Sequence, residues 1–269
     1  MKGVFTSLTK EIVISFWGSV LFVVVFWMIT GRALVLSECI QYGCAALLVL
    51  LSFFLLLSVI SLIRLRRKNI LASRTLREQG VTPWLIGFLW ESIDSAVSDG
   101  DRASAQLVMA SVLSEGGFYD RCFEILAGIN FHDLSQAGQE EYFNIYVYTN
   151  LMLGDAAAAR QIYDRTSMYF DRARMRRHPM AVLHTLGVLS YAEGDISGAE
   201  NYFMQARAAS RDKASLCECE MFLSLCYMKL NKPANAAQAA RAAASHAVSV
   251  YQMRYVEGLR EKLEAAYSH

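Results

Sequence analysis

Two stretches without a charged residue, 12–31 and 39–63, constrain the fold of this chain more than any other feature. Each supplies close to the roughly 20 apolar residues that a helix needs to cross a bilayer core of about 30 Å. Only the short segment 32–38 separates them. The sequence therefore predicts a transmembrane helical hairpin within a two-helix anchor, residues 1–68.

Basic residues flank both apolar stretches. Lys2 and Lys10 precede the first. The second is followed by a basic cluster, which consists of Arg64, Arg66, Arg67 and Lys68. Because Lys and Arg are enriched on the cytoplasmic side of membrane helices, we expect a two-pass integral membrane protein whose C-terminal domain is cytoplasmic. The basic cluster is a candidate contact for anionic lipid.

An alternative interpretation concerns the first stretch alone. Residues 1–31 combine a basic start with an apolar core, as a cleavable signal peptide does. Their apolar core is longer than the usual 7 to 15 residues, and no A-x-A-like site follows it. The membrane anchor is therefore the favoured interpretation.

The rest of the chain has the composition of an all-α domain. From residue 69 onward it carries 19 basic and 23 acidic residues, a mildly acidic balance that argues against nucleic-acid binding. Pro83, Pro179 and Pro233 each stand where a helix should begin. Between them, apolar residues recur at intervals of three and four, with no sustained alternation of the kind that indicates strands.

One segment, 183–206, has the pattern of an internal repeat. Its large, small and turn residues fall where the tetratricopeptide repeat (TPR) family places them: Leu183, Leu186, Gly187, Gly194, Asp195, Ile196, Ala199, Phe203 and Ala206. Ser190 departs from the pattern, because the family prefers tyrosine there. The segment resembles a TPR unit, and the resemblance implies two antiparallel helices that approach closely at their small residues.

Weaker copies of this unit precede and follow it. Their turns are predicted at Gly117, Gly154, Gly194 and Asn231, which are spaced by 37, 40 and 37 residues. The usual TPR period is about 34. Glycine or asparagine at such a turn permits the left-handed backbone that ends a helix.

The repeats set the predicted organisation of the all-α domain. We expect a juxtamembrane helical connector at 69–102, an α-solenoid of TPR-like helix pairs at 103–248, and a capping helix at 249–269. A basic run at 165–177, interleaved with Asp164 and Asp171, falls in the predicted connection between the second and third repeats. It is interpreted either as a solvated loop or as a contact for anionic lipid or an acidic partner.

The first helix of each TPR pair lines the concave face of the solenoid, so the repeat pattern also predicts a binding surface. Nine residues are predicted to form it: Asn144, Tyr148, Leu151, His184, Val188, Tyr191, Met221, Leu225 and Met228. TPR proteins that hold a terminal carboxylate use Lys, Arg and Asn at such positions, and these are largely missing here. We expect a protein partner that presents an apolar or amphipathic segment. For each residue, packing between repeats is the alternative.

The sequence contains no recognisable catalytic motif. It has no phosphate-binding glycine loop, H-E-x-x-H, G-x-S-x-G or C-x-x-C. Cys217, Cys219 and Cys226 come nearest to a metal site, but their spacing points them to different faces of one helix. We therefore expect no catalytic residue, no cofactor and no metal.

Together these features predict a non-enzymatic, membrane-anchored TPR scaffold or assembly factor. The order of two spans, a basic stretch and helical repeats also resembles the layout of HemY-type membrane proteins. The alternative is an accessory subunit of a membrane transport or secretion complex in which the hairpin is the functional element. The lack of charged residues within the spans favours anchoring.

Overall fold

A computed structural model describes Val25 and residues 51–53, 55–56, 59, 70–176 and 179–267. The chain divides into two compact units, Met1–Leu71 and Ala72–His269. The described residues of the second unit form helices and turns without a strand. The predicted all-α class is confirmed for this part of the chain.

The predicted localisation needs correction. Among the residues that the structure describes, no helix is both long enough and apolar enough to cross a membrane. The longest of them, α7 (Ala156–Arg174) and α12 (Val250–Tyr267), carry several charged side chains, which are costly to place in hydrocarbon. This finding contradicts the prediction of a two-pass integral membrane protein with a cytoplasmic C-terminal domain.

Two further predictions concern residues that the structure leaves out. Apart from Val25 and the few positions between 51 and 59, the stretches 12–31 and 39–63 lie outside the described residues. The whole basic cluster lies outside them as well: Arg64, Arg66, Arg67 and Lys68.

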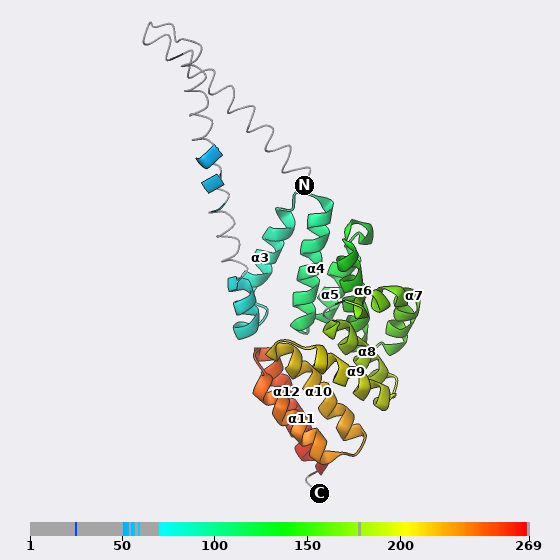
Figure 1. Cartoon of the computed structure of the whole chain (residues 1–269). Helices are drawn as coiled ribbons and strands as arrows, with labels where there is room; N and C mark the ends of the chain where they lie inside the picture. The colour runs from blue at the N-terminus through cyan, green and yellow to red at the C-terminus, as the bar shows by residue number, and fades with distance from the viewer. Residues whose placement is uncertain are drawn as a thin grey trace. The chain divides into compact units, whose positions relative to one another are not determined.

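The second unit is a stack of helices, shown in chain order in Figure 1. It opens with helical residues at 72–79. The elements that follow are α3 (Pro83–Asp94), α4 (Asp99–Glu115), α5 (Tyr119–Ala127), the 3-10 turn η1 (Phe131–Asp133), α6 (Gln136–Met152), α7 (Ala156–Arg174), α8 (Met180–Ala192), α9 (Ile196–Ala209), α10 (Lys213–Lys229), α11 (Pro233–His246) and α12 (Val250–Tyr267).

Four helix pairs make up the array: α4 with α5, α6 with α7, α8 with α9, and α10 with α11. The turn inside each pair contains one residue with a positive φ: Gly117 at 77°, Gly154 at 85°, Gly194 at 84° and Asn231 at 54°. These are the four predicted turn positions, so the left-handed turns are confirmed. In the second and third pairs an aspartate follows the turn and caps the next helix. Asp155 and Asp195 each accept a backbone N–H at 2.9 Å.

The close approach predicted within the third pair is confirmed. A Cβ on Gly187 of α8 would lie 2.7 Å from Cε1 of Phe203 on α9. Phe203 is fully buried, and it packs with Leu186 and Ala199 in the central core cluster. Only a residue without a side chain allows the two helix axes to lie so close at this point.

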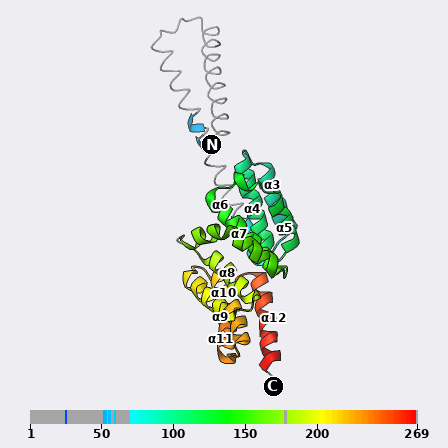
Figure 2. The same cartoon turned by 90° about the vertical axis from the view of Figure 1, so that its right-hand side faces the viewer.

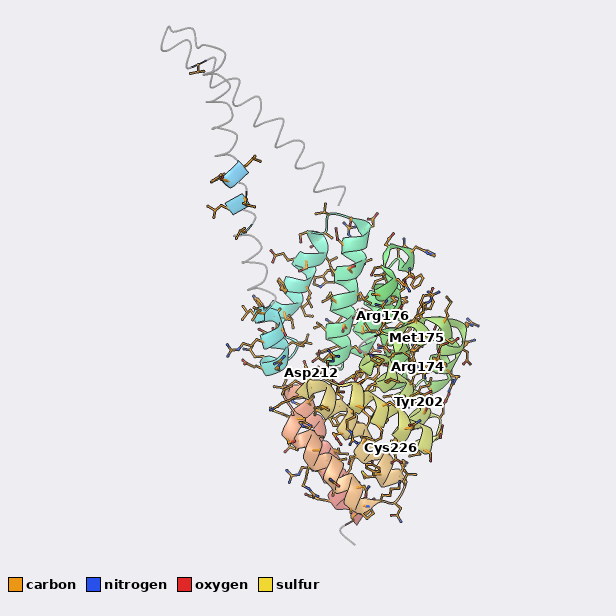
Figure 3. All side chains as sticks on the ribbon, viewed as in Figure 1. Arg174, Met175, Arg176, Tyr202, Asp212 and Cys226 are labelled. Carbon is orange, nitrogen blue, oxygen red and sulfur yellow. The ribbon has the colours of Figure 1, made fainter. Side chains whose placement is uncertain are left out.

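Residues 165–174 of the basic run lie in a helix, not in a connection between repeats. Helix α7 continues to Arg174, and Figure 3 shows Arg174, Met175 and Arg176 together at its end. Part of the run is paired within the array, since Arg176 forms an ion pair with the buried Glu140 of α6. The extra helical turns that these residues add explain why this repeat is longer than a standard TPR.

The start of the last helix contacts the segment that precedes α3. Helix α12 packs against α10 and α11, as Figure 2 shows. The backbone N–H of Val81 donates a hydrogen bond to Oη of Tyr251 at 2.6 Å, across 170 positions of sequence. Gly80, with φ of 82°, leaves room for this ring, because a Cβ there would lie 2.5 Å from the same hydroxyl. The start of α12 is therefore in direct contact with the segment that precedes α3.

Candidate binding cavity

The first helices of the four pairs surround a cavity of about 810 Å³. Its wall is formed by α4, α6, α8 and α10, and α12 closes it on the side where Tyr251 meets Val81. The volume lies within the range of about 300 to 1,000 Å³ that is usual for small-ligand pockets. The concave face of this solenoid therefore contains a cavity that is open to solvent along part of its wall.

The structure separates the nine predicted groove residues into two groups. Four of them line the cavity: Asn144, Tyr148, His184 and Met221. The other five pack between helices away from it: Leu151, Val188, Tyr191, Leu225 and Met228. Leu151 and Val188 are only 8% and 5% exposed, so they serve as core residues. The part that the first group plays in binding stays a prediction.

Aromatic rings form a continuous wall across four helices. The ring centroids of Tyr148 on α6 and His184 on α8 are 6.0 Å apart. His184 contacts Phe222 of α10 at 5.0 Å, and Phe222 lies 6.4 Å from Tyr255 of α12. This wall gives the cavity a rigid apolar side on which a ligand can pack.

His184 is a buried imidazole in the cavity wall, and it is held neutral. Burial lowers its pKa from 6.5 to about 4. Its side chain is 5% exposed, and among the described residues its Nε2 has no hydrogen-bond partner. Oδ1 of Asn144, in the same wall, lacks one too. Since buried polar atoms are nearly always paired in folded proteins, a ligand is a reasonable source of the missing partners.

Two carboxylates that the sequence analysis did not select also line the cavity. Glu218 of α10 has its pKa raised to about 7, first by burial and then by the nearby charge of Glu115. The only side-chain hydrogen bond that offsets this is a long one from Nε2 of Gln252, at 3.5 Å. Burial also raises the pKa of Glu115, at the end of α4, and the charge of Arg77 opposes that rise.

Three tyrosines line the same cavity as Glu218: Tyr119, Tyr148 and Tyr255. Burial raises the pKa of Tyr148 well above its usual value, and the charges of Glu218, Tyr119 and Tyr255 add to the effect. The pKa of Tyr119 is likewise raised by burial first, and then by Tyr255 and Glu218 among its neighbours. We call these three tyrosines and Glu218, which all line the cavity, the tyrosine cluster.

The described residues contain no cluster of His, Cys, Asp or Glu that could hold a metal ion. The cysteines considered from sequence, Cys217, Cys219 and Cys226, are buried. Burial raises the pKa of each thiol to about 12. Because metals bind the thiolate, these side chains are poor ligands as well as poor nucleophiles.

Comparison with known families identifies the array. Residues 95–244 match the family model described as the SusR N-terminal TPR domain. No curated protein and no solved structure matches the chain. The match supports the TPR resemblance but not the resemblance to HemY-type membrane proteins. Since it covers more than half of the sequence, the chain belongs to the family of the SusR N-terminal TPR domain.

Proposed function

We propose that this chain is a non-catalytic scaffold that holds a segment of a partner protein in the cavity formed by α4, α6, α8, α10 and α12. TPR domains commonly bind proteins through the concave side of the array. The observation that carries the proposal is the cavity itself, because its wall combines apolar surface from four helix pairs with polar atoms that have no partner.

The chemistry of the wall indicates the kind of segment that fits. Met152, Met180 and Met221 provide flexible apolar contacts, and Phe222 provides a flat one. Polar side chains line the same cavity, so an amphipathic segment meets both kinds of surface.

A site-specific crosslinking experiment tests the proposal. The photoreactive residue p-benzoylphenylalanine replaces Tyr148 in the full chain, which is expressed in its native cells and irradiated. The captured peptide is then identified by mass spectrometry. We expect a defined peptide at this position. The matched control places the same residue at Tyr202, a tyrosine of similar exposure on the second helix α9 that does not line the cavity and is labelled in Figure 3.

A blocking variant makes the test specific to the cavity. Ser111 lines the cavity and is partly exposed, so Ser111→Trp should fill space there and abolish the crosslink. Ser104→Trp adds the same side chain at an exposed position of the same helix and should leave capture unchanged. Equal capture by the Tyr148 and Tyr202 forms, or capture that survives Ser111→Trp, contradicts the proposal.

A further inference from the structure

Neither carboxylate of the cavity, Glu218 or Glu115, is held in an ion pair within the described part of the chain. Arg77 acts on Glu115 only at longer range, and Arg254 is an exposed residue of the cavity wall. Glu218 is partly buried and Glu115 is exposed, and the charged form of a carboxylate becomes costlier the more it is removed from water.

The surroundings of Glu218 suit a cation. Tyr119, Tyr148 and Tyr255 line the same cavity as the carboxylate, and each ring carries partial negative charge on its face. An ammonium group placed among them gains from the carboxylate and from the rings together. Rings without a carboxylate, or a carboxylate without rings, would select much less strongly for a cation.

His184 adds an independent observation. Its side chain is 5% exposed, it lines the same cavity, and its Nε2 is unpaired among the described residues. A neutral imidazole has one nitrogen that accepts a hydrogen bond, and Oδ1 of Asn144 accepts as well. Carboxylate, imidazole and amide oxygen are all able to accept from an ammonium group, which has three N–H donors and no lone pair.

We propose that the cavity binds a lysine side chain of the partner segment, with the ammonium group held between Glu218, Glu115 and the tyrosine cluster. The alkyl stem of lysine packs against the aromatic wall while its charged end reaches the carboxylates. The inference rests on the proposed function, since it specifies which side chain the partner inserts.

A fluorescent amine tests the cation site without knowledge of the partner. Dansylcadaverine carries an alkylammonium chain like that of lysine, and its N-acetylated form is neutral but otherwise similar. Both are titrated into the full chain, and binding is followed by dansyl fluorescence. We expect the amine to bind about tenfold or more tightly than the acetylated form. Equal affinity for the two probes, or no saturable binding of the amine, overturns the proposal.

Variants test whether the tyrosine cluster causes the preference for the amine over its acetylated form. Glu218→Gln keeps the size of the side chain but removes its charge, and it should reduce the preference for the amine to within about threefold, without weakening the acetylated probe. Tyr148→Phe keeps the ring and should retain the preference for the amine over the acetylated probe. Tyr148→Leu removes the ring and should reduce that preference several-fold. The matched control is Glu261→Gln, a change of the same charge at an exposed position of α12. A full preference in Glu218→Gln refutes the assignment.

The two proposals can fail separately. If Ser111→Trp abolishes the protein crosslink but Glu218→Gln leaves the crosslink and the probe preference unchanged, the protein-binding function stands and the lysine site does not. If the amine binds with the expected preference but no peptide crosslinks at Tyr148, the cation site stands without a protein partner. Acetylation of lysine in the captured peptide provides a direct check, because it should abolish rebinding.

Discussion

Replacing Gly187 by alanine should destabilise the array by about 2 kcal/mol. The new Cβ would lie 2.7, 2.8 and 2.9 Å from three atoms of the Phe203 ring. The ring has no room to retreat, because it is fully buried and packs against Phe222 and His184 at centroid distances of 5.1 and 5.4 Å. Overpacking of this kind costs about 1 to 3 kcal/mol, and a ring held from behind places the cost near the upper end. Alanine has a better helix propensity than glycine, which stabilises the helix by about 1 kcal/mol and leaves a net loss of about 2 kcal/mol.

Urea denaturation followed by circular dichroism measures this loss, which corresponds to a fall in melting temperature of about 4 to 8 °C for a unit of this size. Gly258→Ala is the matched control. Gly258 lies in helix α12 with no other atom within 4 Å of its Cβ position, so the same substitution should stabilise the chain by about 1 kcal/mol there. If Gly187→Ala is as stable as the unmodified chain while the control behaves as expected, the close approach of α8 and α9 is not what makes glycine necessary.

Other predictions concern pH and the turns. Glu218 has a pKa of about 7 in the folded chain, above its ordinary value of 4.5, so the folded state holds more protons between these values and its stability falls as pH rises through that window. Glu218→Gln should therefore raise the free energy of unfolding at pH 8 by about 1 to 3 kcal/mol and leave it nearly unchanged at pH 4. The effect of His184 has the opposite sign, because its pKa is about 4 when folded against 6.5 when exposed, and stability is lost as pH falls from 6.5 to 4. In His184→Phe the melting temperature should fall less between pH 6.5 and pH 4. An unchanged fall would mean that another group causes the loss of stability. Gly194→Ala should cost about 1 to 2 kcal/mol in urea denaturation, through its φ of 84° alone, since no other atom lies within 4 Å of its Cβ position. Tyr251→Phe should cost about 1 to 2 kcal/mol and speed hydrogen exchange at the amide of Val81, which loses its acceptor.

The helix pairs of this array are predictable from sequence because each requires particular residues at positions close together in the chain. A left-handed turn requires glycine or asparagine, and the position of the turn fixes the end of one helix and the start of the next. Close helix packing requires a small residue such as Gly187 opposite a large one such as Phe203. Both requirements act over short stretches of chain, so they can be read without knowledge of the whole fold.

The cavity was only partly predictable, because its shape depends on contacts between distant residues. Tyr148 and Leu151 both lie on α6 and both met the spacing rule for the concave face, but Tyr148 lines the cavity whereas Leu151 packs into the core. Spacing along a helix shows which face of the helix a residue lies on, but it does not show how deeply the residue is buried. Burial depends on how the neighbouring helix pairs are arranged. Glu218 was missed because it stands between two cysteines in a helix judged by its apolar residues. Two glutamates, Glu218 and Glu220, within an otherwise apolar run are the signal that could have revealed it.

The contact between Tyr251 and Val81 joins the start of α12 to the segment before α3, beside the cavity. An open solenoid changes its curvature at little cost, because each repeat touches only its neighbours. Here a hydrogen bond at 2.6 Å and the space left by Gly80 join residues that are 170 positions apart. A ligand in the cavity would contact α4 and α12 at the same time, so its binding energy would also hold the two ends together. Occupancy should therefore slow hydrogen exchange at the amide of Val81, which touches no ligand itself, and Tyr251→Phe should weaken that coupling without altering any group of the tyrosine cluster.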